Sequence, residues 1–153
     1  MINKEIIGMT KRQFREREEN RKTVNEKVIN QLAAILLQDN KCEIVKQYFE
    51  RNAIRTFAIY GGGDAGKEFE RVCSKCHLKP EYFIDKFISG KIGEIPIFQI
   101  RFDFLPEVDA VIIMPCHEKD FIKFEIGNYF TDACQLIGID DCFKEMEEMQ
   151  NEA

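Results

Sequence analysis

The stretch RTFAIYGGGDAG, residues 55–66, decides the fold, because three glycines join a predicted strand to a predicted helix. The residues before the glycines are strand formers or small, and a helical pattern starts directly after them at Asp64. A strand, a glycine turn and a helix in this order present the helix N-terminus to a phosphate. The spacing of Gly61, Gly63 and Gly66 fits the G-x-G-x-x-G pattern. The sequence therefore predicts a nucleotide-type pocket at this turn.

The residues of this turn have distinct expected roles. Gly61 lets the chain turn tightly off the strand, because glycine adopts positive φ at low cost. Gly63 lets a pyrophosphate approach the backbone, and Gly66 lets the first helical turn pack close to the strand. The unpaired N–H groups of the helix N-terminus then hold the anion, and Asp85, one βαβ half-unit later, holds a ribose hydroxyl. The alternative is a glycine turn that serves only close packing of the helix on the sheet.

Residues 61–67 also match G-x-x-x-x-G-K, the first part of a P-loop. A P-loop continues with Ser or Thr, whose hydroxyl binds magnesium, whereas this sequence continues with Glu68. That carboxylate would face the triphosphate, so we exclude a P-loop ATPase.

The composition predicts one soluble globular domain, with room for an appendage, because the 153 residues are 44% hydrophobic and 32% charged. No apolar run approaches the ~20 residues of a membrane span. The N-terminal sequence MINKEIIGMTKRQFRERE lacks an apolar core of signal-peptide length, so we expect a cytoplasmic protein. In that compartment the six cysteines are expected to stay reduced and to serve mostly as small buried hydrophobes.

The charge distribution is uneven along the chain. Residues 1–52 have a net charge of +3 and residues 53–153 a net charge of −8, which gives the formal total of −5. An acidic domain repels the negatively charged phosphate backbone, so nucleic-acid binding is disfavoured.

The N-terminal part, residues 1–52, is predicted to form a helical hairpin. Residues 10–38 form one long helix and residues 42–52 a second. The hairpin must bury its apolar residues either against the sheet domain or against another copy of the chain, as a homodimer. The apolar stripe of the first helix consists of Val24, Val28, Leu32, Ile35 and Leu36.

Residues 53–153 are predicted to form a Rossmann-like domain, because strands alternate with helices from residue 55 onward. Residues 90–93 are expected to lie in a loop. A parallel sheet of order 3-2-1-4-5 follows if the crossovers are right-handed and the glycine turn lies at the switch point. The predicted strands are 56–60, 81–84, 95–98, 109–114 and 134–137, and the predicted helices are 65–76, 118–130 and 140–149.

His117 is the second candidate for a functional role. It follows Pro115 at the carboxyl end of the fourth predicted strand, where ligands bind in open α/β sheets. Its imidazole could contact a phosphate or act as a general base, or it could be a solvent-facing cap residue in the first turn of a helix. We find neither a Ser-His-Asp arrangement nor paired carboxylates, so the sequence assigns no catalytic residue.

The segment Cys73-Ser-Lys-Cys76-His77 spells the C-x-x-C-H pattern of covalent haem attachment, which requires export and is therefore not expected here. The same cysteines could bind zinc together with Cys116 and His117. A parallel sheet places the two pairs at opposite ends, however, so we expect no metal site.

Three segments carry a resemblance to a known family: FAIYGGGDAGKEFE at 57–70, PEYFIDKFISGKIGEIPIF at 80–98 and LPEVDAVIIMP at 105–115. Together they resemble the Rossmann-like domains of bacterial surface-polysaccharide proteins. These are the N-terminal domain of sugar O-acyltransferases, the leading domain of nucleotide-sugar epimerase/dehydratases and small tail domains of glycan gene clusters. The resemblance spans about residues 42–149.

The resemblance implies binding of a nucleotide, a nucleotide-sugar or NAD(P), with the ribose at Asp85. Within these residues we find no acyl-transferring β-helix, no dehydratase domain with its Tyr/Lys pair and no methyltransferase module, so catalysis is in doubt. The residues implied to line the phosphates are Gly61, Gly63, Asp64, Ala65 and Gly66.

We therefore expect a nucleotide-sugar-binding or dinucleotide-binding domain that acts as an accessory or regulatory protein in bacterial surface glycan biosynthesis. The ligand would be NAD(P) or a UDP-type nucleotide, with Pro115 and His117 also at the site, and glycan biosynthesis enzymes would be the protein partners. One alternative is a minimal NAD(P)-dependent oxidoreductase or sugar epimerase that uses His117. Another is a dimeric scaffold without a ligand.

Overall fold

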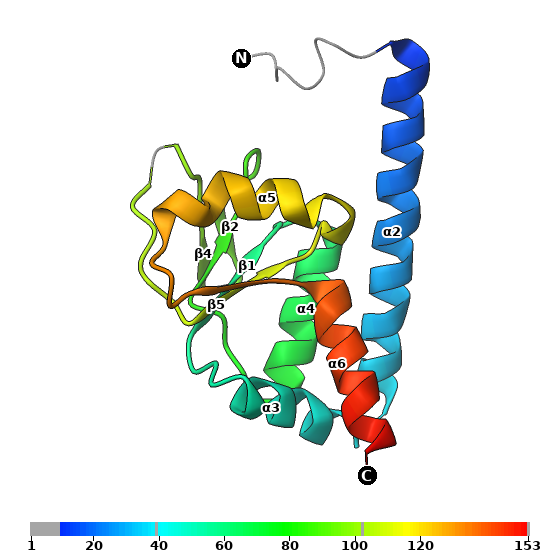
Figure 1. Cartoon of the computed structure of the whole chain (residues 1–153), viewed down its shortest axis with the longest axis vertical. Coiled ribbons are helices and arrows are strands. Elements are labelled where there is room, and N and C mark those ends of the chain that lie inside the picture. Colours follow the sequence, from blue (N-terminus) through cyan, green and yellow to red (C-terminus); the bar gives the residue numbers. More distant parts are fainter. Residues whose placement is uncertain (1–9, 39, 102, 153) are drawn as a thin grey trace.

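A computed structural model describes residues 10–38, 40–101 and 103–152 of the chain. Residues 1–9, on which the expectation of no signal peptide partly depends, lie outside this part. The described chain is a mixed α/β structure with a six-stranded, mostly parallel sheet and a long helix at its N-terminal end (Figure 1). The elements are α2 (Lys11–Leu37), α3 (Lys41–Arg51), β1 (Phe57–Tyr60), α4 (Asp64–Lys75), β2 (Tyr82–Ile84), β3 (Gly90–Ile92), β4 (Ile95–Phe98), β5 (Ala110–Ile113), η1 (Cys116–Glu118), α5 (Lys119–Ile126), η2 (Gly127–Tyr129), β6 (Gln135–Gly138) and α6 (Ile139–Asn151).

The strand order of the sheet is β3-β4-β2-β1-β5-β6, and every neighbouring pair is parallel except β3 with β4. This differs from the predicted order 3-2-1-4-5, which has five strands and places residues 90–93 in a loop. Residues 90–92 instead form an edge strand, because Ile92 and Ile95 pair across a two-residue turn that starts at Gly93 with a φ of 60°. Beside that edge strand lie β4, β2, β1, β5 and β6, which the prediction numbered 3, 2, 1, 4 and 5.

Successive residues of β1 point to opposite faces of the sheet, so the sheet has a core on each face. Phe57 and Ile59 join the larger core, which includes buried residues of α2, α3, α4 and α6. Ala58 and Tyr60 join the smaller core, which includes buried residues of α5. All four residues of β1 are buried, as expected for a central strand that is covered on both faces.

The first helix begins with a capping box, in which Thr10 and Gln13 satisfy each other's backbone N–H groups. Its C-terminal half buries Val28 and Leu32 in the larger core, and the helix lies beside α4 (Figure 1). The apolar stripe of α2 is therefore covered within the chain. Pairing of two copies through the N-terminal helices stays a prediction.

Asp109 ties the start of β5 to the start of β1. Its Oδ2 accepts the backbone N–H groups of Arg55 at 2.8 Å and Thr56 at 3.0 Å, while its own N–H donates to the Thr56 hydroxyl at 3.0 Å. The hydrogen bonds from Arg55 and then Thr56 hold the pKa of the Asp109 carboxyl below its ordinary value.

A pH dependence of stability follows from this lowered pKa. Asp109 stabilises the fold above the ordinary carboxyl pKa of about 3.9, and the contribution is lost as the pH falls through the folded-state value. We expect Asp109→Asn to lower the urea midpoint at neutral pH and to flatten its acid dependence. Urea titrations of both proteins from neutral pH to about pH 3 measure this, and parallel curves would contradict it.

Candidate functional site

A pocket of about 380 Å³ opens at the carboxyl ends of the central strands. Its walls come from the segments that follow β1, β2 and β5, from α5 and from the N-terminal half of α2. β1 lies between β2 and β5, so the chain leaves β1 in one direction for β2 and β4 and later continues on its other side through β5 and β6. Open α/β sheets bind ligands at this kind of topological switch point.

The glycine turn has the conformation that its spacing predicts. Gly61 has a φ of 105°, and an added Cβ there would meet Pro115 at 3.3 Å. An added Cβ on Gly66 would stand 1.8 Å from the carbonyl oxygen of Gly61, so α4 packs against the turn at a distance that only glycine permits. At Gly63 no atom lies within 4 Å of the position of a Cβ. Of the three glycines in the pattern, Gly63 is thus the one with open space beside it.

The N-terminus of α4 faces this pocket. Gly63 is the N-cap and supplies no side-chain cap, and Asp64, Ala65 and Gly66 line the pocket. The N–H groups of a first helical turn have no partner within the helix and carry partial positive charge. The arrangement can accept an anion, although Asp64 places a carboxylate beside it.

Asp85 also lines the pocket, but its carboxylate already holds backbone groups. Its Oδ2 accepts the N–H of Gly62 at 2.8 Å, and its Oδ1 accepts those of Phe87 at 2.8 Å and Ile88 at 2.9 Å. Asp85 therefore fastens the glycine turn to the chain that follows β2. Contact of Asp85 with a ribose stays a prediction. A ribose hydroxyl would have to donate to a lone pair of the carboxylate that these three hydrogen bonds do not use.

One face of α2 forms a wall of the pocket that our sequence analysis missed. The spacing of its residues, i, i+3, i+4, i+7 and i+11, is that of one helix face, and it continues the apolar stripe of Val28 and Leu32 toward the N-terminus. The sequence signal for this wall was that its residues fall on the same helix face as Val28 and Leu32. The polar composition of the N-terminal part of α2 concealed that signal. The wall residues are Phe14, Arg17, Glu18, Arg21 and Asn25.

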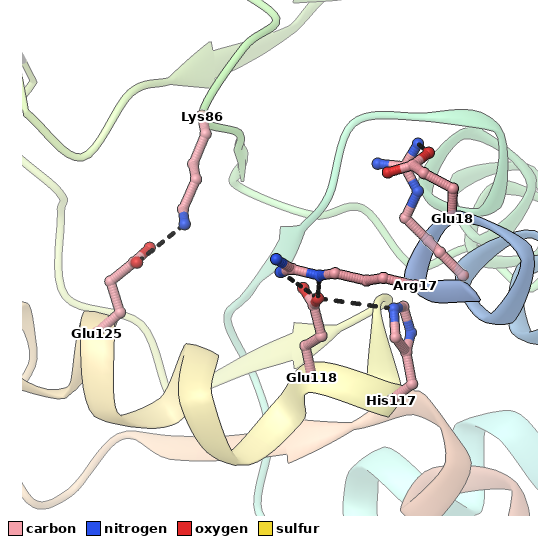
Figure 2. Close-up of polar contacts among 7 residues, drawn as sticks. Arg17, Glu18, Lys86, His117, Glu118 and Glu125 are labelled. Carbon is pink, nitrogen blue, oxygen red and sulfur yellow. Dashed lines mark hydrogen bonds and ion pairs between the residues drawn. The ribbon is translucent and has the colours of Figure 1, made fainter. Parts of the chain in front are cut away.

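Each cation of the pocket lining is held by a carboxylate (Figure 2). The Nε of Arg17 donates to Oε1 of Glu118 at 2.9 Å, and Arg21 pairs with Glu18 at 2.7 Å. The third cation, Lys86, pairs with Glu125 at 2.9 Å and lies 5.5 Å from the ring centre of Phe121.

Three exposed aromatic side chains line the pocket together with these charges and the buried Tyr60. Phe14 is on α2, Phe87 lies in the segment after β2, and Phe121 is on α5. All three side chains are exposed to solvent. Exposed aromatic faces beside a helix N-terminus can stack against a base or a sugar while the helix holds a phosphate.

Pro115 lines the pocket, whereas His117 does not. The His117 side chain is 9% exposed, so it is not the solvent-facing cap residue of one prediction. Neither ring nitrogen has a hydrogen-bond partner within the described residues. Burial lowers the pKa of His117 below its usual value, so the imidazole is neutral at pH 7.

The Cys73–Cys76 pair and Cys116 lie on different elements. Cys73 and Cys76 are buried at the C-terminal end of α4, and Cys116 follows β5. All six thiols of the chain are free. Within the described ranges no three His, Cys, Asp or Glu side chains are grouped so that they could hold a metal ion, and no helix has the length and apolar character to cross a membrane.

Comparison of the chain with protein-family models, with curated proteins and with solved structures gave no match.

Proposed function

We propose that this protein binds a nucleotide, a nucleotide-sugar or a dinucleotide through its diphosphate at the N-terminus of α4. The observation that carries the proposal is the position of Gly63, whose open side faces a pocket at the carboxyl ends of the parallel strands. The backbone of Gly63 and the first turn of α4 would hold the phosphates.

The charges of the pocket favour a diphosphate diester over a triphosphate. Arg17, Arg21 and Lys86 each have a carboxylate partner, and Asp64 and Asp85 add negative charge to the lining. A metal-free triphosphate carries about twice the negative charge of a diphosphate diester, and it would need more uncompensated positive charge than this lining supplies. A diester, as in UDP-sugars and NAD, carries less charge and brings a base and a sugar for the aromatic residues.

A role in bacterial surface glycan biosynthesis, with enzymes of that process as partners, is part of the proposal through the family resemblance alone. The enzyme alternative has less support, because the His117 ring is buried and lies outside the pocket lining. A general base must reach the proton that it removes.

The test is thermal unfolding of the full chain with UDP, UDP-glucose, NAD, NADP and CoA. A ligand at about 100 times its Kd adds about 2.7 kcal/mol of stability, a rise of several degrees in Tm for a domain of this size. We expect such a rise for one of the diphosphate ligands. We also expect Gly63→Val to abolish it, because the new side chain would occupy the open space that the phosphate needs.

Gly63→Ala and Ser89→Ala are the matched controls. No atom lies within 4 Å of a Cβ at Gly63, so Gly63→Ala and Gly63→Val should both fold. Gly63→Ala should weaken ligand binding less than Gly63→Val, because alanine has the smaller side chain. Ser89 is exposed and is not among the residues of the lining, so its variant should bind as the wild type does. If none of the five ligands changes Tm, the proposal is wrong.

A further inference from the structure

Phe14 is the one aromatic side chain of the polar segment of α2 that forms the pocket wall. No other apolar residue lies between Lys11 and Thr23 in the sequence, and Phe14 is 39% exposed. It lies on the helix face that lines the pocket, because it precedes Arg17 by three residues and Arg21 by seven. Phe14 therefore offers its ring to the pocket and not to the core of the protein.

The ion pair between α2 and η1 places Phe14 and a second exposed aromatic side chain, Phe121, in the same cavity. Arg17 extends from α2 to Glu118 of η1, with its Nε 2.9 Å from Oε1 (Figure 2). Phe14 comes three residues before Arg17, and Phe121, on α5, comes three residues after Glu118. Phe121 is 45% exposed, although the ammonium of Lys86 lies over its ring. Two rings from different elements are thus available to one ligand.

Phe14 lies far from the glycine turn along the pocket. The C-terminal ends of α2 and α4 meet where Lys75 donates to the carbonyl oxygen of Leu36. The two helices pack side by side, and a rise of about 1.5 Å per residue brings the start of α4 level with Asn25 of α2 (Figure 1). Phe14 is about 16 Å further along α2. A group that binds to the Phe14 ring is therefore distinct from the phosphates at α4.

The polar side chains near these rings favour a flat ring over a sugar. A bound sugar needs hydrogen-bond partners for its hydroxyl groups. Arg17 is paired with Glu118 and Arg21 with Glu18, so the charged groups of this wall already hold one another. A planar heterocycle binds through its faces instead, and any base can stack on an aromatic side chain.

We propose that Phe14 of α2 and Phe121 of α5 form a stacking subsite for a planar heterocyclic ring of the ligand, a nucleobase or a nicotinamide. The ring is joined to the diphosphate that the first turn of α4 holds, and the ion pair of Arg17 with Glu118 stays intact when the ring binds. The inference rests on the proposed function, because it assigns the ring-binding residues of the same pocket and makes α2 part of the binding site.

The first experiment uses fluorescence, because the chain contains no tryptophan and a single introduced indole reports on its own position. Phe14→Trp keeps an aromatic face in the subsite, and a stacked heterocycle should quench its fluorescence. The matched control is Phe124→Trp on α5, where the native side chain is 83% exposed and lies outside the pocket lining. We expect UDP or NAD to quench the first variant and not the second. Inorganic pyrophosphate, which has no ring, should quench neither.

ADP-ribose distinguishes the two sources of the ring, because it is NAD without the nicotinamide. If NAD quenches the fluorescence of Phe14→Trp and ADP-ribose binds without quenching it, the ring is the nicotinamide. If UDP or ADP-ribose quenches it as well, the ring is a nucleobase. Both results support the stacking subsite.

Affinity measurements separate ring stacking from simple packing of α2. Phe14→Leu keeps an apolar side chain but removes the ring, so it should weaken binding of UDP or NAD by about fivefold or more. Phe14→Tyr keeps the ring and should bind as the wild type does, while Phe121→Leu should show a loss of the same kind as Phe14→Leu. Affinity for pyrophosphate should not change in these variants. The control Phe124→Leu should bind every ligand as the wild type does.

The outcomes separate this inference from the proposed function. If a nucleotide or dinucleotide raises Tm and Gly63→Val abolishes the rise, but Phe14→Leu and Phe121→Leu bind it as the wild type does, the inference is wrong and the proposed function stands. The inference is also wrong if the bound ligand leaves the fluorescence of Phe14→Trp unchanged, or if Phe14→Tyr loses as much affinity as Phe14→Leu. If no nucleotide or dinucleotide changes Tm, the proposed function and the inference are both wrong.

Discussion

Gly66→Ala is expected to destabilise the protein by at least about 3 kcal/mol, which would lower its Tm by about 10 °C. Helix propensity alone predicts the opposite sign, because alanine is more favourable than glycine inside a helix by about 1 kcal/mol. The packing decides the outcome, since the new Cβ would stand 1.8 Å from the carbonyl oxygen of Gly61. That neighbour is backbone at the base of the turn, so relief requires a shift of α4 away from β1.

Urea denaturation of the wild type, Gly66→Ala and Gly63→Ala measures this effect. Gly63→Ala makes the same chemical change three residues earlier in the same turn, at a position where a Cβ meets no atom within 4 Å. We expect it to cost less than about 1 kcal/mol, the usual difference between glycine and alanine at an N-cap. Equal stability of the two variants would show that α4 does not pack against the turn as described.

Asp85→Ala is expected to cost about 2 to 3 kcal/mol, because three backbone N–H groups lose a charged acceptor. Asp85→Asn should cost less, since one amide oxygen can still serve either Gly62 or the pair Phe87 and Ile88, but not both sides. Chemical denaturation gives the free energies. Hydrogen exchange at the amides of Gly62, Phe87 and Ile88 shows whether the loss is local to these bonds.

Asp103→Ala is the control for this variant. Asp103 is an exposed carboxylate that accepts one backbone N–H, that of Gln99 at 2.8 Å, and it lies outside the pocket lining. Its removal should cost less than about 1 kcal/mol. If Asp85→Asn instead keeps full stability and loses only affinity for a nucleoside-bearing ligand, the ribose is its main partner and the fastening role is secondary.

The parallel strands and the glycine turn could be predicted because both leave local signals. A run of buried strand formers followed by G-x-G-x-x-G fixes β1, the turn and the start of α4 within a few residues. Asp85 could likewise be placed at the pocket, because the carboxyl ends of neighbouring parallel strands meet at one edge of the sheet. Its three hydrogen bonds could not, since they depend on how the chain turns after β2.

Three features escaped prediction, one because its local signal is weak and two because they depend on long-range packing. β3 is short, and its signal was limited to two isoleucines that flank Gly93 and Glu94. The surroundings of His117 include the contact of η1 with α2, whose Arg17 and Arg21 are more than ninety residues away in the sequence. The α2 wall of the pocket was hidden because Arg17 and Arg21 resemble an ordinary solvated helix face until the helix is placed beside α4.

Because α2 is long, it connects the pocket with the opposite end of the molecule. The helix is unbroken from the pocket wall to its last turn, near Leu36, whose carbonyl oxygen accepts a bond from Lys75 at the far end of α4. Its 27 residues span about 40 Å, and its buried contacts, at Val28 and Leu32, are nearer to that far end than to the pocket. A small tilt of α2 about Val28 and Leu32 would therefore displace the residues at the pocket more than the residues at the other end of the helix. The C-terminal end of α2 lies against α3 and α4, so such a tilt would also displace the contacts at the opposite end of the protein.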